Sequence, residues 1–294
     1  MKVIDSIEEF RAARRALTGT VALVPTMGYL HAGHLRLMQR ARQEADHLAV
    51  SIFVNPTQFA PGSDLDAYPR DPEGDRQKCA DAGCQLLFMP TPETIYTPDH
   101  ATFVEVESLD QTLCGPKRPG HFRGVTTIVG KLFNIVSPDV AVFGQKDFQQ
   151  LAIIRQMVRD LNFPVEIISL PTVREADGLA LSSRNKYLDP EDRTRATCLS
   201  RALAAAWHAY QGGERDGEAL VALGRKVLCE TVALEDIDYI ECVDPLRLTR
   251  FAGDEAQISD ARGAVLAMAV QVGKARLIDN LRLDGGLPEA LRDF

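Results

Sequence analysis

Apolar runs alternate with amphipathic segments along roughly the first 170 residues of the chain. The runs are short and apolar on both faces, which is typical of strands buried inside a parallel sheet. We expect strands at about 20–25, 48–54, 85–89, 139–143 and 165–170. Helix start and stop signals accompany the other segments, and we expect helices at about 7–17, 33–46, 71–83, 124–136 and 148–161. This repeated strand–helix–strand order predicts an α/β fold, a Rossmann-like doubly wound parallel sheet.

One segment departs from this pattern. Residues Thr102 to Glu107, with the sequence TFVEVE, alternate apolar and charged side chains. Such alternation is typical of a strand with one face exposed, so we expect a strand here, at an edge of the sheet.

The character of the chain changes after Leu170. A polar, turn-rich segment is followed by Ala- and Leu-rich helices, expected at about 190–210 and 217–232, and by three strands at about 237–243, 264–272 and 275–283. This order predicts a smaller α+β domain. We place the boundary near Val173, which gives a Rossmann-like domain over 1–172 and a C-terminal α+β domain over 173–294.

Composition narrows the range of functions. The net charge of −8 argues against general nucleic-acid binding, which needs a basic surface, so an anionic substrate must be attracted by local positive charge. The N-terminal MKVIDSIEEF has acidic residues where a signal peptide would be apolar, and no apolar run approaches membrane-spanning length, so we expect a cytoplasmic protein. The six cysteines contain no C-x-x-C pair and are expected to be free, mostly structural thiols.

The stretch Val21 to Leu37 combines a strand, a glycine-bearing loop and a helix start. A helix N-terminus after such a loop favours phosphate, because backbone N–H groups and the helix dipole point at the ligand. His31 and His34 lie about one turn apart at that helix start, so both can reach one phosphate. The alternative is a pair of ordinary histidines, one of them capping the helix. A metal site is less favoured, since no third ligand lies nearby.

Other unusual polar residues follow the predicted strands in the loops 55–70, 115–124 and 144–150, where a parallel sheet binds its ligands. Lys146 is a point charge suited to a triphosphate, whereas Asp147 could equally cap the next helix. Further along the chain, Ser182, Ser183 and Arg184 offer hydroxyl and guanidinium donors for phosphate.

Two glutamines and a basic segment suggest a second, organic substrate. The amides of Gln58 and Gln150 could recognise a small polar molecule, and Arg118, His121 and Arg123 would suit a carboxylate, although any one of these residues could be a surface residue. The chain has no Walker lysine after its glycines and no G-x-G-x-x-G in the first strand–helix turn. The residues therefore favour a nucleotidyl transferase that acts on ATP and a small acid.

Four blocks of sequence carry a family resemblance: PTMGYLHAGH, FVNPTQF, RPGHFRGVTTIVGKLFNIVSPDVAVFGQKDFQQ and DGLALSSRN. Together they resemble the pantoate–β-alanine ligases, over nearly the whole chain. The H-x-G-H and serine-rich blocks alone are also similar to signatures of class I aminoacyl-tRNA synthetases and other nucleotidyltransferases, whereas the glutamine-bearing blocks narrow the likeness to this family.

The resemblance implies a two-step ligation. Pantoate attacks the α-phosphorus of ATP-Mg²⁺ to give pantoyl adenylate and pyrophosphate, and the amine of β-alanine then displaces AMP to give pantothenate. It also implies that 1–172 is a nucleotide- and pantoate-binding domain and that 173–294 is a lid domain. It further implies a homodimer and Mg²⁺ carried by the ATP phosphates without direct protein ligands. A non-catalytic nucleotide sensor and a related nucleotidyltransferase for another acid or alcohol remain alternatives.

The resemblance also assigns roles by position. His34, assisted by His31, and Lys146 are expected to act on the phosphates during catalysis. The expected ATP-binding residues are Met27, Gly28, Tyr29, Leu30, His31, Ala32, Gly33, His34, Gly144, Gln145, Lys146, Asp147, Val173, Leu181, Ser182, Ser183 and Arg184. The expected pantoate and β-alanine residues are Gln58, Gln150, His121 and Asn55.

Overall fold

The chain divides into two units, each described here by itself. The computed structural model describes residues 1–59, 65–292 and 294. The first unit comprises 1–107, 118–145 and 153–171, and the second comprises 108–117, 146–152 and 172–294. The main division thus falls between Pro171 and Thr172, and two short segments from the N-terminal half group with the second unit.

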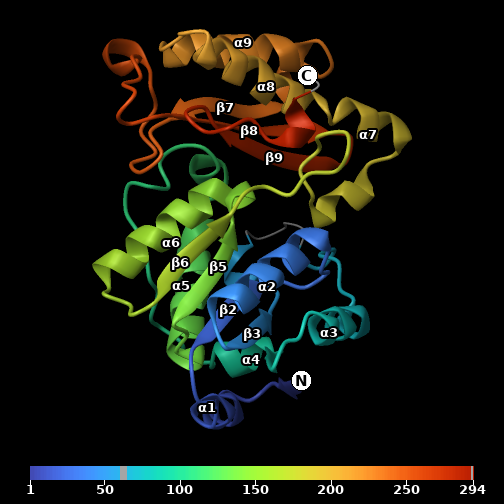
Figure 1. Cartoon of the computed structure of the whole chain (residues 1–294), viewed down its shortest axis with the longest axis vertical. Helices are drawn as coiled ribbons and strands as arrows, with labels where there is room; N and C mark the ends of the chain where they lie inside the picture. Colours follow the sequence, from blue (N-terminus) through green and yellow to red (C-terminus); the bar gives the residue numbers. More distant parts are fainter. Residues whose placement is uncertain (60–64, 293) are drawn as a thin grey trace. The chain divides into compact units, whose positions relative to one another are not determined.

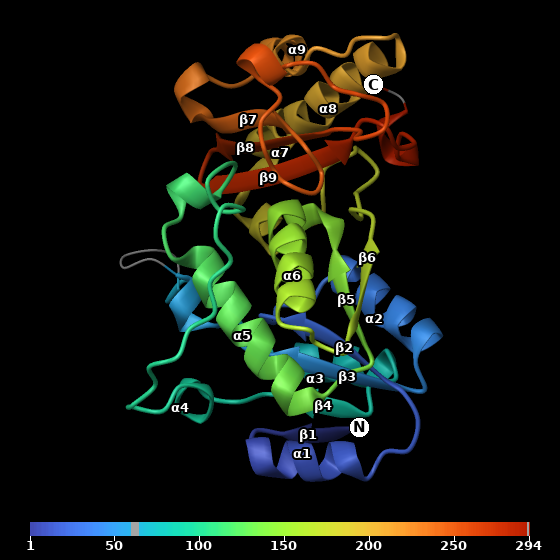
Figure 2. The ribbon, with the colours of Figure 1, turned by 90° about the vertical axis from the view of Figure 1, so that its left-hand side faces the viewer.

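The first unit is built on a six-stranded parallel sheet, as the apolar runs predict (Figures 1 and 2). Its strands, in spatial order, are β1 (Lys2–Ile4), β4 (Leu86–Phe88), β3 (His47–Ile52), β2 (Val21–Thr26), β5 (Val140–Gly144) and β6 (Glu166–Leu170). From β2 the chain proceeds through β3 to β4 in one direction and through β5 to β6 in the other. Strand order therefore reverses between β2 and β5, and in doubly wound sheets ligands bind outside the carboxyl ends of the strands at that point.

Helices cover both faces of this sheet. Buried residues of α2 (Ala32–Glu44) and α3 (Pro72–Asp81) join one hydrophobic cluster with β2, β3, β4 and β5. The other helices of this part of the chain are α1 (Ile7–Arg15), α4 (Pro92–Ile95), α5 (His121–Val136) and α6 (Phe148–Asp160). The helix α5 is apolar almost all round, with 13 of its residues buried.

The segment 102–107 is not a strand, so the expected edge strand is wrong. Its backbone is bound by side chains of α5 instead of a neighbouring strand. Val104 donates its N–H to Thr127 Oγ1 at 3.0 Å, and the Val104 carbonyl accepts from Thr126 Oγ1 at 2.6 Å. Phe103 also lies under the Arg123 guanidinium, 3.9 Å from the ring centroid. Apolar and charged residues alternate because one face of this segment packs on α5. Such packing gives the same two-residue period as an edge strand.

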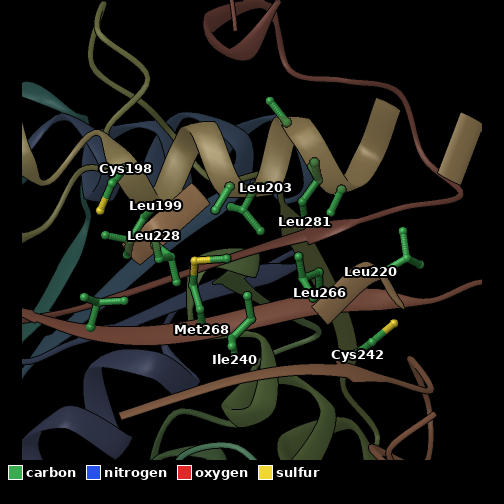
Figure 3. Packing of buried hydrophobic residues seen from close by; sticks show 14 of the residues in the cluster. Cys198, Leu199, Leu203, Leu220, Leu228, Ile240, Cys242, Leu266, Met268 and Leu281 are labelled. Carbon is green, nitrogen blue, oxygen red and sulfur yellow. The ribbon is translucent and has the colours of Figure 1, made fainter. Parts of the chain in front are cut away.

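The second unit contains an antiparallel sheet of β7 (Ile237–Val243), β8 (Val265–Val272) and β9 (Ala275–Arg282), in that order. The expected helix over 190–210 is two helices, α7 (Pro190–Arg195) and α8 (Cys198–Gln211), and it is followed by α9 (Gly217–Cys229). Leucines of α8 and α9 pack on β7 and β8 around Ile240, Leu266 and Met268 (Figure 3). Gly224 allows this close approach, because a Cβ there would lie 2.7 Å from Ile240 Cδ1.

All six cysteines are free thiols, five of them buried and Cys229 exposed. Burial raises the pKa of the Cys79, Cys84 and Cys242 thiols to about 12 and that of Cys198 to about 11. These four side chains therefore stay protonated and pack as small apolar groups. None of the described helices combines the length and apolar character needed to cross a membrane.

Candidate active site

The loop after β2 is tightly constrained. Gly28 has φ +85° and Tyr29 has φ +51°, so the chain passes through the left-handed region before α2 begins. Thr26 Oγ1 accepts the Gly28 N–H at 3.2 Å and donates to the Ser51 carbonyl at 2.9 Å. A Cβ on Gly28 would lie only 3.0 Å from atoms of Asp75 and Ile52. This loop therefore requires glycine at position 28.

Asp75 braces the same loop and was not predicted from the sequence. It lies in α3, is 1% exposed, and accepts the Tyr29 and Leu30 N–H groups on its two carboxylate oxygens at 2.7 Å each. Lys78 Nζ lies 3.8 Å away. The sequence contains one clue that Asp75 is buried. It precedes Cys79 by four residues, so both side chains lie on the same buried face of α3. Acidic residues are common near a helix start, because they interact favourably with the helix dipole. The sequence alone therefore does not reveal that Asp75 binds the loop after β2.

The two histidines cap α2 together. His31 Nδ1 accepts the Gly33 N–H at 3.1 Å, and His34 Nδ1 accepts the His31 N–H at 3.3 Å. Their ring centroids are 4.1 Å apart, and a Cβ on Gly33 would lie 2.9 Å from His31 Cε1. Because each Nδ1 acts as an acceptor, the neutral rings carry their protons on Nε2. The capping alternative thus holds for His31, and it also fixes both rings at the helix start.

A buried amide cluster follows β3. Asn55 is 1% exposed and Gln58 is 8% exposed, although both side chains are polar. Asn55 Nδ2 donates to Gln58 Oε1 at 3.1 Å and to the Gly124 carbonyl at 3.0 Å. A Cβ on Gly124 would lie 2.5 Å from the Thr57 carbonyl oxygen, so glycine is needed where α5 approaches this turn. Gln58 Nε2 reaches Met27 Sδ at 2.8 Å, which brings the amide cluster next to the loop after β2.

His121 supports this cluster from the start of α5. Its Nδ1 lies 2.8 Å from the Gln58 carbonyl oxygen, and its Nε2 lies 3.0 Å from Arg118 Nη1. A carbonyl only accepts and a guanidinium only donates, so the ring is neutral with its proton on Nδ1. Both ring nitrogens therefore contact protein groups, and the imidazole holds the Gln58 backbone.

The end of β5 supplies Gly144 and Gln145. A Cβ on Gly144 would meet no described atom within 4 Å, so packing within the protein does not require glycine there. Gln145 Nε2 donates to Ser169 Oγ at 3.2 Å, and Arg155 Nη2 donates to the same oxygen at 2.9 Å. The backbone after β5 is thus tied to β6.

Lys146, Asp147 and Gln150 belong to the second unit. Lys146 and Asp147 lie in a single 3₁₀ turn, Gln145–Asp147, and the Lys146 carbonyl accepts from Asn280 Nδ2 at 2.8 Å. Gln150 is half-buried in the first turn of α6. Its neighbour Gln149 is the buried glutamine, and it binds the Cys114 N–H and the carbonyls of Leu109 and Thr112.

Val173 and Leu181 are paired in the second unit, where the Leu181 N–H donates to the Val173 carbonyl at 2.9 Å. The hairpin between them is held by a two-pronged ion pair from Arg174 to Asp279, with distances of 2.6 and 2.9 Å and side-chain exposures of 3% and 1%. Ser182 Oγ accepts the Arg184 N–H at 3.2 Å, which starts the 3₁₀ turn Ser183–Tyr187. The predicted ATP-binding residues of this segment therefore form one local structure.

Comparison with known proteins identifies the family. A model of the pantoate–β-alanine ligase family matches residues 2–282. The chain belongs to the pantoate–β-alanine ligase family. It is 52% identical over 287 residues to a pantothenate synthetase of Heliobacterium modesticaldum, a match that covers 96% of this chain and 99% of the relative. The resemblance recognised in the four sequence blocks is thus confirmed, and the chain is an enzyme of the ligase class.

Solved structures agree with the fold. A pantothenate synthetase of Thermus thermophilus is 46% identical, with a TM-score of 0.88 and coverage of 96% of this chain and 99% of that one. A pantoate–β-alanine ligase of Francisella tularensis, solved with β-γ ATP and β-alanine, is 32% identical, with a TM-score of 0.75 and coverage of 97% and 99%. The predicted α/β Rossmann-like fold with a smaller C-terminal part is therefore confirmed.

Proposed function

We propose that this chain joins pantoate and β-alanine to form pantothenate, at the expense of ATP, through a pantoyl-adenylate intermediate. The observation that carries the proposal is the contact between Gln58 and Met27. It brings a buried amide cluster, suited to a polar organic acid, next to the loop that leads to His31 and His34. Family membership and the ATP complex of the Francisella relative support the same conclusion.

The first step activates the carboxylate. A pantoate carboxylate oxygen attacks the α-phosphorus of ATP, the bond to the bridging oxygen breaks, and pyrophosphate leaves. Negative charge builds up on the phosphate oxygens during this transfer, so donors that are already in position lower the barrier. His34 is the principal donor through Nε2–H, His31 assists it, and Lys146 adds a positive charge.

The second step forms the amide bond. The amine of β-alanine attacks the acyl carbon of the adenylate, loses a proton, and AMP leaves with the former carboxylate oxygen. Because AMP is a good leaving group, the protein mainly has to position the two reactants, and no covalent enzyme intermediate is needed. The buried, protonated cysteines agree with this, since a nucleophilic thiol requires a lowered pKa.

The proposed ATP contacts are the residues that follow β2 and β5 together with the hairpin segment of the second unit: Met27, Gly28, Tyr29, Leu30, Ala32, Gly33, Gly144, Gln145, Asp147, Val173, Leu181, Ser182, Ser183 and Arg184. The proposed pantoate contacts are Gln58 and Gln150, and Gln58 is also proposed to contact β-alanine. Asn55 and His121 are proposed to complete the substrate site through their hydrogen bonds to Gln58.

We propose Mg²⁺ as an ion carried by the ATP phosphates. Among the described residues, no group of three or more His, Cys, Asp or Glu side chains is arranged to hold a metal ion. The candidate phosphate residues are donors, which fits a metal that enters with the nucleotide, where it offsets phosphate charge. We also propose a cytoplasmic location, as expected from the sequence, and, from the family resemblance, a homodimer in which residues 173–294 act as a lid.

The adenylate can be tested by following an oxygen atom. Pantoate labelled with ¹⁸O in its carboxylate is incubated with ATP, Mg²⁺ and β-alanine, and AMP is analysed by mass spectrometry. One ¹⁸O per AMP is expected, because the attacking oxygen leaves with the phosphate. Unlabelled AMP formed together with pantothenate would contradict the adenylate. Binding of ATP without any pantothenate would instead favour a nucleotide-binding protein.

A further inference from the structure

Tyr96 lies just after α4, and its ring is held by aromatic neighbours. The ring centroid lies 6.3 Å from that of Phe53 and 5.0 Å from that of His100, and Lys131 Nζ of α5 lies 5.4 Å from it. The His100 ring in turn contacts Phe103, with centroids 5.2 Å apart. This row of rings fixes the direction of the Tyr96 hydroxyl. No sequence pattern assigned Tyr96 a role.

The Tyr96 hydroxyl is directed at the amide cluster. It donates to Asn55 Oδ1 at 2.8 Å and lies 3.1 Å from Thr57 Oγ1, which itself donates to Asn55 Oδ1 at 3.0 Å. Burial raises the pKa of Tyr96, so the hydroxyl remains a donor at neutral pH. An amide oxygen only accepts, so both hydroxyl groups can donate to Asn55 Oδ1 and stabilise this orientation of the amide.

The opposite side of Asn55 is fixed by an acceptor. Its Nδ2 faces the Gly124 carbonyl, which cannot donate, and the same nitrogen donates to Gln58 Oε1. The Gln58 oxygen is therefore turned toward Asn55, and its Nε2 is turned toward Met27 Sδ. A thioether is a weak acceptor, so the N–H groups of Gln58 keep most of their capacity to bind a stronger one.

We propose that Tyr96 is a positioning residue which, together with Thr57, sets the orientation of the Asn55 and Gln58 amides so that Gln58 offers N–H donors to an acceptor oxygen of the organic acid. The inference rests on the proposed function, since it takes that acid to be pantoate. A reversed Gln58 amide would present its oxygen to the carboxylate and repel it. Tyr96 thereby contributes to selection of a carboxylate or hydroxyl oxygen without touching the substrate.

Steady-state kinetics of Tyr96→Phe test the proposal. The substitution keeps the ring and removes one hydrogen bond, so we expect the pantoate KM to rise about fivefold, whereas kcat and the ATP KM stay within about twofold. Thr57→Val removes the other donor and should act similarly. The double variant should raise the pantoate KM by more than the product of the two single effects, because only then does Asn55 Oδ1 lose both donors. Tyr210→Phe, at a buried tyrosine of the second unit, is the matched control.

Adding Tyr96→Phe to a Gln58→Ala variant distinguishes a positioning role of Tyr96 from a role in packing. In Gln58→Ala the amide that is proposed to bind pantoate is absent, so adding Tyr96→Phe should leave the pantoate KM unchanged. A further increase in that background, an unchanged pantoate KM for Tyr96→Phe alone, or equal changes in the pantoate and ATP KM values would overturn the inference. A wild-type protein that forms no pantothenate would instead overturn the proposed function itself, and the two failures are thus distinguishable.

Discussion

In the first unit, the candidate site residues are held largely by hydrogen bonds between neutral groups, whereas in the second they are framed by ion pairs. Asn55, Gln58 and His121 bind one another and nearby backbone, and Asp75 supplies a buried carboxylate to the loop after β2. In the second unit, Arg174 joins Asp279 across 105 residues of sequence.

This difference predicts that substitutions in the two units have different consequences. Neutral hydrogen bonds orient amides and imidazoles but contribute about 1 kcal/mol each, so their loss should mainly change kinetic constants. A buried ion pair leaves an uncompensated charge when one partner is removed, so its loss should mainly change the free energy of unfolding. The predictions below test this division, from the largest expected effect to the smallest.

Asp279→Ala should be the most destabilising of these substitutions. It leaves the Arg174 guanidinium buried without its carboxylate, at a cost of about 3–5 kcal/mol in the free energy of unfolding. Chemical denaturation measures the loss. Replacing both residues, as Arg174→Met with Asp279→Leu, should recover most of it, because neither charge then remains buried. A single variant as stable as the wild type would show that the pair does not hold the hairpin.

His34→Ala should lower kcat by on the order of 100-fold or more while the protein stays folded, since it removes a donor needed as charge moves onto the phosphates. Initial rates and thermal unfolding measure the two properties. His208→Ala, at an exposed histidine of α8, is the control. Near-wild-type turnover of the His34 variant would remove this residue from the mechanism.

Asp75→Asn should raise the ATP KM about tenfold with only a modest loss of stability. The amide nitrogen of asparagine cannot accept a backbone N–H, so one of the two bonds to the loop at Tyr29 and Leu30 is lost. The measurement is the ATP KM compared with that of Asp81→Asn, an exposed carboxylate at the end of α3. If both variants behave alike, Asp75 does not brace the loop.

Arg193→Ala should have the smallest effect, about 0.2–1 kcal/mol in the free energy of unfolding. Arg193 pairs with Glu175 and Asp177, but the three side chains are 26%, 35% and 42% exposed, so water and salt screen the pairs. Denaturation at low and high salt measures this. A loss as large as that for Asp279→Ala would show that burial is not what distinguishes the ion pairs.

Much of the fold could be predicted from the sequence, because short runs that are apolar on both faces, such as Val21–Val24, are typical of strands in a parallel sheet. The strand β1 was not predicted, since three residues are too few to show a period. The segment 102–107 was misassigned because the hydroxyl groups of Thr126 and Thr127, not a strand, satisfy its backbone.

Some features of the candidate site could likewise be predicted from the sequence, and others could not. The placement of His31, His34 and Gln58 after strands β2 and β3 could be predicted from the sequence, whereas the roles of these residues stay predictions. Asp75 and Tyr96 could not, because their roles depend on contacts with residues 46 and 41 positions away in sequence. Local pattern carries no information about such long-range hydrogen bonds, and only the folded chain reveals them.

The central claim is that the chain forms an acyl adenylate, and isotope exchange tests it most directly. The wild-type protein is incubated with ATP, Mg²⁺, pantoate and labelled pyrophosphate in the absence of β-alanine, and label in ATP is counted. The account predicts exchange that depends on pantoate and is nearly abolished in His34→Ala. Absence of pantoate-dependent exchange above background in the wild type would contradict it.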